Sequence, residues 1–224
     1  MTGVVENGVE FFSGGKFGFT QEYLSNIFDE YYSSGKSDVY PNVADYKVKD
    51  IHRITSLNKI YEALQKKLSL NELGFSLSKL WLVDTKTDNV DISKLPYIPH
   101  IDFQRYLKVM VYVDAVTDLD GPFTARPTPP AEFEKLRKAL SLDYKKNHEN
   151  LITKYELTEY IKFEAEGGSV LVFDTNCPHF AGEVKDGGHR RVFRFDFERP
   201  EWRRDTTLTT RLRARVRKLF EIKN

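Results

Sequence analysis

Hydrophobic residues recur at helical spacing in two segments of the first third of the chain. In residues 20–32 they lie on one face, behind the possible N-cap Thr20, and comprise Tyr23, Leu24, Ile27, Phe28, Tyr31 and Tyr32. A second amphipathic helix begins at Ser56 or Asn58, with an apolar side formed by Ile60, Tyr61, Leu64 and Leu68. Residues 1–18 have no helical period and predict an irregular arm or a short edge strand. We expect both helices to pack against a sheet.

From about residue 75 the pattern becomes that of β-strands. Residues 77–83 and 107–113 are rich in apolar and aromatic side chains, and residues 169–173 form the nearly continuous apolar run of a strand buried on both faces. In residues 190–197 hydrophobic positions alternate, which places Phe193, Phe195 and Phe197 on one face. Turns are expected at Asp120-Gly121-Pro122 and at Asp186-Gly187-Gly188. Residues 131–162 are predicted to be helical or mixed.

The C-terminal residues 206–222 predict a basic amphipathic helix. One side is apolar, and the other carries Arg211, Arg213, Arg215, Arg217 and Lys218. Such a helix can bind a membrane surface, a nucleic acid or an acidic partner. We favour a helix that packs through its apolar side and exposes its basic face to solvent.

Composition narrows the class of protein. The chain has 224 residues, of which 40% are hydrophobic and 30% charged, which is the balance of one soluble globular domain. A net charge of +1 provides no overall attraction to nucleic acid or anionic lipid. The single cysteine, Cys177, excludes an intramolecular disulfide and suits a reducing compartment. With no signal peptide or apolar run of membrane length, we predict a cytoplasmic protein without nucleic-acid or membrane partners.

Three residues have the chemistry of a metal centre. In an extended run, side chains two positions apart share a face, so His100 and Asp102 project together. His179, which follows the buried strand of residues 169–173, can supply a third ligand. Two histidines and one carboxylate form the facial triad of non-haem Fe(II) oxygenases, which leaves coordination positions open for a co-substrate and O₂.

The order of these elements predicts the fold class. Helices come first and strands dominate the second half, with ligand candidates at strand ends. This order suits a mainly β protein with flanking helices and a double-stranded β-helix core, the jelly-roll or cupin architecture. We expect a single domain over residues 1–224, with N-terminal helices at about 20–70, the jelly-roll core at about 75–200 and the C-terminal helix at about 206–222.

Arg190 is a candidate anchor for a co-substrate. Its guanidinium can bind a carboxylate through two parallel hydrogen bonds and so hold the far end of a dicarboxylate that chelates the metal. Arg191 is its rival, because a shift of one residue in the hairpin exchanges their faces. If Phe193, Phe195 and Phe197 pack outward on the helices, Arg191 shares their side and Arg190 points into the barrel.

At these positions the sequence resembles the Fe(II)- and 2-oxoglutarate-dependent oxygenases, most closely their phytanoyl-CoA dioxygenase-like branch. The resemblance lies in His100-Ile101-Asp102, in residues 107–114 with Gly121-Pro122-Phe123, and in residues 168–175 followed by His179, Gly182 and Arg190. It implies that His100, Asp102 and His179 bind Fe(II) and that Arg190 binds the distal carboxylate of 2-oxoglutarate. Because halogenating relatives lack the carboxylate, Asp102 implies hydroxylation, or a related oxidation, of an unactivated C–H bond of a small molecule by O₂, with 2-oxoglutarate decarboxylated to succinate.

The substrate side departs from that family. Residues 124–130 read Thr-Ala-Arg-Pro-Thr-Pro-Pro where such proteins often have Pro-Gly-Ser-His. Gln104, Arg105 and Arg126 are the first candidates for contact with a polar or anionic substrate. Lys108, Tyr106 and Thr175 are candidates for supporting the ligands. Two other functions stay open: a metal-dependent jelly-roll enzyme that does not use 2-oxoglutarate, and a non-catalytic jelly-roll binding protein.

Overall fold

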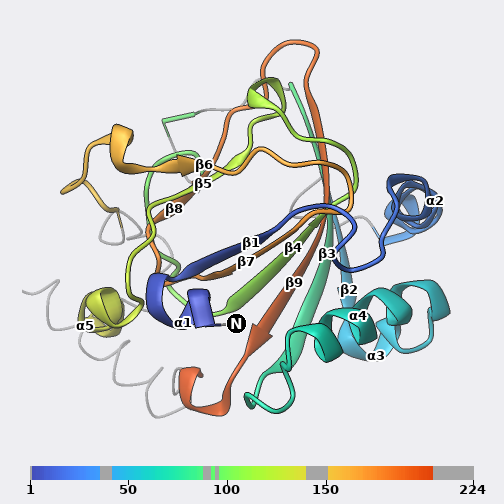
Figure 1. Ribbon diagram of the computed structural model, residues 1–224, viewed down its shortest axis with the longest axis horizontal. Coiled ribbons are helices and arrows are strands. Elements are labelled where there is room, and N and C mark those ends of the chain that lie inside the picture. The colour runs from blue at the N-terminus through green and yellow to red at the C-terminus, as the bar shows by residue number, and fades with distance from the viewer. Residues whose placement is uncertain (1, 36–41, 88–91, 94–95, 140–150, 204–224) are drawn as a thin grey trace, which may run out of the picture.

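The computed structural model describes residues 2–35, 42–87, 92–93, 96–139 and 151–203, and its strands form two antiparallel sheets (Figure 1). The large sheet has the order β1 (Val9–Phe12), β7 (Val170–Asp174), β4 (Leu107–Tyr112), β9 (His189–Glu198), β3 (Ser76–Lys86) and β2 (Val43–Lys47). The small sheet has the order β6 (Ile161–Lys162), β5 (Phe123–Ala125) and β8 (His179–Ala181). The predicted class, a mainly β protein with flanking helices and a jelly-roll core, is confirmed.

Helices cover the face of the large sheet that points away from the small sheet (Figure 1). They are α2 (Gln21–Tyr32), α3 (Val48–Ile51) and α4 (Thr55–Lys67). Helix α1 (Thr2–Asn7) precedes β1, and helix α5 (Ala131–Ala139) lies between β5 and β6. Short 3₁₀ turns are η1 (Ser33–Gly35), η2 (Asp118–Asp120), η4 (Leu157–Glu159) and η5 (Pro200–Trp202). No helix in the described ranges has the length and apolar character needed to cross a membrane.

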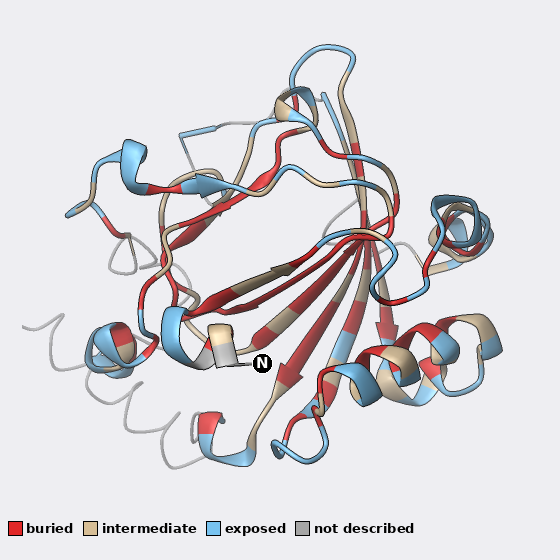
Figure 2. Cartoon of the chain, viewed as in Figure 1, coloured by how far each residue is buried: buried red, intermediate tan, exposed pale blue. Residues whose placement is uncertain are grey.

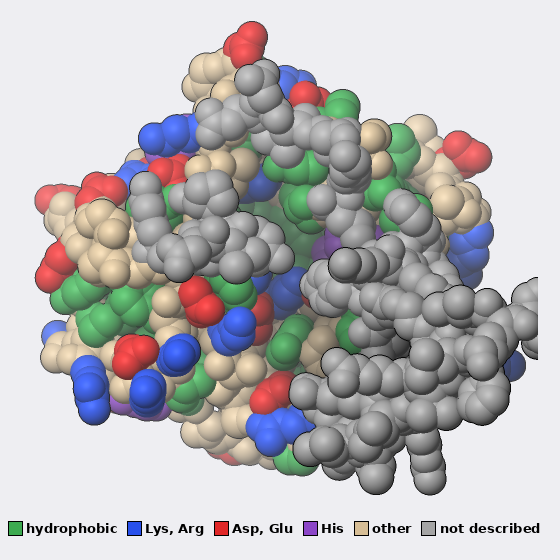
Figure 3. Space-filling view, turned by 180° about the vertical axis from the view of Figure 1, so that it is seen from behind, with side chains coloured by type: hydrophobic (Ala, Val, Ile, Leu, Met, Phe, Trp, Pro, Cys, Tyr) green, Lys and Arg blue, Asp and Glu red, His purple; other side chains and the backbone are tan. Residues whose placement is uncertain are grey.

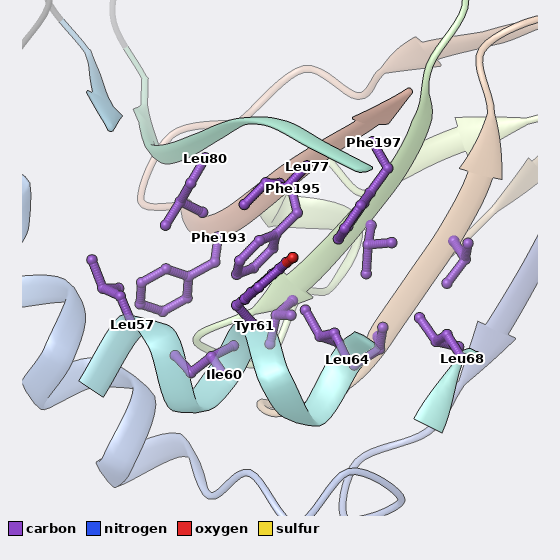
Figure 4. Packing of buried hydrophobic residues seen from close by; sticks show 14 of the residues in the cluster. Leu57, Ile60, Tyr61, Leu64, Leu68, Leu77, Leu80, Phe193, Phe195 and Phe197 are labelled. Atoms are coloured by element: carbon purple, nitrogen blue, oxygen red, sulfur yellow. The ribbon is translucent and has the colours of Figure 1, made fainter. Parts of the chain in front are cut away.

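The main core lies between α4 and the large sheet. Leu57, Ile60 and Leu64 of α4 are fully buried, and they face the phenylalanines of β9 (Figure 4). Tyr61 stacks on Phe197, with ring centroids 6.2 Å apart. Burial of apolar area of this kind is the main force that holds the helix on the sheet. Exposed residues accordingly gather on the outer side of the helices (Figure 2).

A second hydrophobic cluster fills the space between the two sheets. It contains Met110, Tyr112, Phe123, Phe173 and Val192, and the rings of Phe123 and Phe173 lie 4.2 Å apart. Because side chains alternate along a strand, the even-numbered residues of β9 point into this interior while its phenylalanines point toward the helices. Arg190, an even-numbered residue of β9, therefore lies on the interior wall.

Most predicted elements are present, with differences at their ends. The Thr20 cap is confirmed, since its side chain accepts a hydrogen bond from the Tyr23 amide. Helix α4 begins at Thr55, one residue before the predicted Ser56, and β3 continues to Lys86. The predicted C-terminal helix at 206–222 lies outside the described residues, as do residues 140–150 of the segment predicted to be helical or mixed.

Several elements were not predicted, among them helix α3 and the three strands of the small sheet. Two others are α1 and β2. The short helix α1 precedes β1, and strand β2 lies in a segment that is largely polar in sequence. Only Ala44 and Tyr46 of β2 are buried, since this edge strand pairs with β3 alone. With two buried positions in five residues, its alternation is too short to stand out from a loop.

Candidate metal centre

His100, Asp102 and His179 come together at the end of the small sheet, with one possible ligand atom of each within 4.8 Å of the others. The Asp102 Oδ1 atom lies 3.6 Å from His100 Nε2 and 3.7 Å from His179 Nε2. The two histidines form an antiparallel bridge, in which each amide donates to the other's carbonyl at 3.0 Å. The Asp102 amide donates to the Thr175 carbonyl at 3.0 Å. Main-chain pairing thus fixes the positions of all three side chains.

Hydrogen bonds set the orientation of both imidazole rings. His100 Nδ1 lies 2.7 Å from the Ile98 carbonyl and His179 Nδ1 lies 2.8 Å from the Cys177 carbonyl. A carbonyl can only accept, so Nδ1 is the protonated nitrogen in each neutral ring and Nε2 keeps its lone pair. Burial, together with the neighbouring His100, lowers the pKa of His179 to about 3. His179 is therefore neutral at physiological pH and ready to bind a cation.

Asp102 is held as an anion by Lys108. The Lys108 ammonium donates to Asp102 Oδ2 at 2.5 Å, which leaves Oδ1 directed toward the histidines. Burial raises the pKa of Asp102, but Lys108 and the two imidazoles outweigh burial and hold that pKa well below its ordinary value. The site therefore offers two imidazole nitrogens and one charged oxygen, the donor set of a non-haem iron centre.

The turn before His179 is braced by a network of buried polar groups. Arg105 donates to both carboxylate oxygens of Asp174 at 2.7–3.1 Å, and the Asn176 amide donates to Asp174 Oδ1. The Asn176 side chain in turn donates to Glu134 of α5 at 2.6 Å. These bonds join β7, α5 and the Gln104–Tyr106 segment around the turn, so the position of His179 depends on all three.

The site is walled by aromatic rings and opens on the Asp102 side. Phe173 and Phe123 lie 5.0 and 5.6 Å from the His179 ring. The side chains of His100 and His179 are 7% and 5% exposed, whereas that of Asp102 is 21% exposed. The face of the molecule opposite to that in Figure 1 has a hollow in which Lys or Arg and His side chains are visible (Figure 3).

Arg190 projects into the same interior, from the neighbouring part of β9. It is 7% exposed, and its one hydrogen bond among the described residues is a long contact of 3.5 Å to the Gly182 carbonyl. The charge interactions of its guanidinium are with Tyr112, Tyr97 and Asp120, but no described carboxylate forms an ion pair with it. A buried cation without an ion-pair partner is costly unless an anion binds it.

Tyr112 adds a second unpaired group beside Arg190. Its hydroxyl is buried and forms no hydrogen bond of normal geometry in the described structure, and burial raises its pKa to about 12 although the Arg190 charge and a contact with the Phe123 backbone oppose this. The phenol is therefore a neutral donor. Sequence reasoning missed Tyr112, although alternation along β4 places it on the same face as Lys108.

Arg191 lies on the other side of the sheet. Its guanidinium binds Asp114 through two hydrogen bonds of 2.7 Å and Asp29 of α2 through a third. The structure therefore directs the two neighbouring arginines in opposite directions, with Arg190 inside the jelly-roll and Arg191 on the helix side.

The three residues first considered for substrate contact have structural partners. Arg105 is bound to Asp174 and Glu134, and Arg126 packs 3.6 Å over the Tyr155 ring while it donates to Glu159. Gln104 donates to the Trp202 carbonyl at 3.1 Å. Each of these side chains is used within the fold.

Comparison with family models and with curated proteins found no match. Solved structures do match. EvdO2 from Micromonospora carbonacea var. aurantiaca, complexed with 2-oxoglutarate, is 12% identical, covers 88% of each chain and has a TM-score of 0.57. HygX from Streptomyces hygroscopicus, with nickel, 2-oxoglutarate and hygromycin B bound, is 11% identical and has a TM-score of 0.56; the match covers 88% of this chain and 85% of HygX. The epimerase SnoN, in complex with Fe³⁺, alpha ketoglutarate and nogalamycin RO, is 12% identical and has a TM-score of 0.58; the match covers 88% of this chain and 81% of SnoN. At these identities the likeness shows the shared fold.

Proposed function

We propose that this protein is a non-haem Fe(II)- and 2-oxoglutarate-dependent oxygenase that acts on a small molecule. One observation carries the proposal: a two-histidine, one-carboxylate cluster shares an interior with a buried arginine that has no ion-pair partner among the described residues. The cluster fits Fe(II), and the arginine fits the distal carboxylate of a dicarboxylate bound to that metal. Structural neighbours that contain 2-oxoglutarate with iron or nickel support this combination.

Each residue then has a defined role. His100, Asp102 and His179 hold the metal through Nε2, Oδ1 and Nε2, with ring orientation set by the Ile98 and Cys177 carbonyls. Arg190 binds the distal carboxylate of 2-oxoglutarate, and the Tyr112 hydroxyl donates a second hydrogen bond to it. The aromatic wall excludes water from the side of His179.

Bound Fe(II), 2-oxoglutarate and O₂ together supply the oxidising chemistry, in which 2-oxoglutarate is decarboxylated to succinate. We infer that the outcome is hydroxylation of an unactivated C–H bond, because the carboxylate of Asp102 completes the triad. The neighbours SnoN, an epimerase, and SnoK, a carbocyclase, are enzymes of other outcomes on the same fold. The order of the motifs supports placement in the phytanoyl-CoA dioxygenase-like branch.

Anaerobic titration tests the proposal. Addition of Fe(II) and then 2-oxoglutarate is expected to produce a weak visible charge-transfer band, and oxygen is expected to yield succinate. Arg190→Met should retain iron and lose 2-oxoglutarate affinity by about tenfold or more, since a charge-assisted bond is removed. Tyr112→Phe should weaken 2-oxoglutarate several-fold without loss of stability, because its hydroxyl has no partner to lose.

Arg191→Met is the matched control, since it removes a guanidinium from the same strand on the opposite face and should leave the band intact. Iron binding that persists unchanged in His100→Ala would contradict the metal assignment. Iron binding without any effect of 2-oxoglutarate would favour the alternative of a jelly-roll metalloenzyme that uses no such co-substrate.

A further inference from the structure

Arg194 belongs to the interior face of the large sheet, on the strand that pairs with the strand of Lys108. It is an even-numbered residue of β9, in register with Met110 of β4 on one side and with Trp81 of β3 on the other. Its strand neighbour Asp196 is in register with Lys108, the residue that binds Asp102. Directly paired residues have Cβ atoms about 5 Å apart. A single strand spacing therefore separates the Arg194–Asp196 pair from the residue that holds a metal ligand.

The guanidinium of Arg194 is held in one orientation. Its Nε donates to Asp196 Oδ1 at 3.1 Å, and its Nη2 lies 3.5 Å from Asp196 Oδ2. The guanidinium also lies over the Trp81 ring, 5.0 Å from the centroid, while the Trp81 indole donates to Asp196 Oδ2 at 2.8 Å. An arginine fixed by a carboxylate and an aromatic ring loses little side-chain entropy when it binds a ligand.

One edge of this guanidinium is available to a ligand. Its hydrogen bonds to described residues all go to Asp196, so Nη1 has none, and the side chain is 28% exposed. Asp196 is only 6% exposed and is covered by its two donors. Lys79, 45% exposed, lies 4.6 Å from the Trp81 centroid and is paired with Asp45 at 3.6 Å. At Arg194 itself, an approaching molecule therefore meets the open edge of the guanidinium rather than the covered carboxylate of Asp196.

We propose that Arg194 binds an anionic group, a carboxylate or a phosphate, on the primary substrate. The inference rests on the proposed function, in that it places the substrate between this arginine and the metal centre. Planar, paired N–H donors fit both anions, and they fit them better than a neutral polar group. Arg105 cannot serve in the same way, because all three of its guanidinium nitrogens donate to Asp174 or Glu134.

The competing explanation is that Arg194 only neutralises the buried Asp196. The test therefore removes both charges together, in Arg194→Met/Asp196→Asn, which leaves no unpaired buried carboxylate. In this variant the amide introduced at position 196 keeps an acceptor for the Trp81 indole. A Trp202→Phe background leaves Trp81 as the one tryptophan, because the chain has two. Its fluorescence reports ligands at this face.

Protein loaded with Ni(II) and 2-oxoglutarate is titrated with inorganic phosphate and, separately, with acetate. We expect a saturable change in Trp81 fluorescence with at least one anion, and the one that binds more tightly identifies the group. The double substitution should weaken that binding about tenfold or more. Arg191→Met, which removes the arginine on the opposite face of β9, should bind the anion as the background does.

Three results would overturn the inference: no saturable signal with either anion, equal affinity in the double variant, or loss of 2-oxoglutarate binding in the double variant, which would assign Arg194 to the co-substrate. The proposed function fails separately. If 2-oxoglutarate does not bind the background protein but phosphate binding still depends on Arg194, the anion site stands and the oxygenase assignment does not.

Discussion

Three arginines of β9 illustrate how residue position determines chemical role. Arg190 and Arg194 point into the jelly-roll, whereas Arg191 points to the helices and pairs with Asp114. The cause is the two-residue period of a strand, which assigns neighbours to opposite faces. Arg190 lacks an ion-pair partner among the described residues, Arg191 is saturated, and Arg194 is held by Asp196 with one edge exposed. The same type of side chain thus has three different environments within one strand.

Lys108→Met is expected to weaken metal binding by about tenfold, because groups that orient a ligand carboxylate typically contribute about 10- to 100-fold to affinity. Lys108 holds Asp102 Oδ2 at 2.5 Å and so directs Oδ1 toward the histidines. Without it the carboxylate can rotate, and its pKa should rise toward the ordinary value, since the Lys108 charge is the strongest of the influences that lower it. Competition with a chromophoric chelator measures the affinity.

The opposite result is also informative. A positive charge beside a metal site repels the cation, so tighter binding in Lys108→Met would mean that repulsion outweighs orientation. Lys185→Met is a suitable control, because Lys185 pairs with the exposed Asp118 in a connection away from the triad.

At the scale of elements, the β8–β9 connection passes close to the η2–β5 connection, and this contact sets the position of β8. A Cβ on Gly182 would lie 2.6 Å from the Gly121 carbonyl carbon and from the Pro122 oxygen. These are backbone atoms that cannot move aside cheaply. By contrast, Gly187, in the same β8–β9 connection, has a φ of +82° and nothing within 4 Å of an added Cβ.

Gly182→Ala is therefore expected to lower the free energy of unfolding by about 3 kcal/mol or more, and to weaken metal binding, because β8 carries His179. Gly187→Ala should cost about 1 kcal/mol through its left-handed backbone alone. Urea denaturation measures both. Equal costs for the two variants would show that the connections can separate without disturbing β8.

Helix α5 provides a pH-sensitive support for the turn before His179. Burial raises the pKa of Glu134, but hydrogen bonds from Arg137 and Asn176 and the charges of Arg137 and Arg105 outweigh burial and lower it to about 2, from an ordinary value of 4.5. A carboxyl group with a lowered pKa stabilises the folded state fully above pH 4.5, and that contribution is lost as the pH falls through about 2.

Glu134→Gln should accordingly decrease the loss of stability between about pH 4.5 and 2, which urea denaturation at a series of pH values measures. The effect is reduced by solvent screening, because the Glu134 side chain is 24% exposed. The exposed Glu72→Gln is the matched control and should follow the wild type. A Glu134→Gln profile parallel to the wild type would contradict the proposed support.

For the whole molecule, the large sheet separates stability from function. Its outer face packs against α2 and α4 in the main hydrophobic core (Figure 1). Its inner face bears Lys108, Arg190 and Arg194. A substitution on the outer face should therefore change stability while the metal centre of the folded protein stays intact.

Leu64→Ala tests this separation. Leu64 is fully buried between α4 and the sheet, so its truncation should cost about 2–5 kcal/mol of unfolding free energy. Metal affinity measured where the variant is fully folded should equal that of the wild type. Lys66→Ala, an exposed change on the same helix, should alter stability by less than about 0.5 kcal/mol. A large loss of metal affinity in Leu64→Ala would show that the two faces are coupled.

Local pattern in the sequence was sufficient for much of the architecture. Long runs with a clear period, such as the face of α2 behind Thr20 and the phenylalanines of β9, predicted element type and orientation correctly. Elements with a weak period were missed, as β2 shows. The two-residue spacing of His100 and Asp102, and the place of His179 after a buried strand, indicated which residues form the cluster. This is possible because ligand chemistry depends on residue type, and the face of a strand on which a side chain lies depends on spacing.

Tertiary structure determined which polar side chains keep hydrogen-bond donors that are not used within the fold. The sequence suggested Arg105 and Arg126 for the substrate, but folding brings Asp174 and Glu159 to them from distant segments. Tyr112 and Arg194 were not distinguished in the sequence, and strand pairing places them in the interior with unused donors. The physical reason is that hydrogen-bond saturation depends on contacts between strands far apart in the chain, whereas a residue's face depends only on its neighbours.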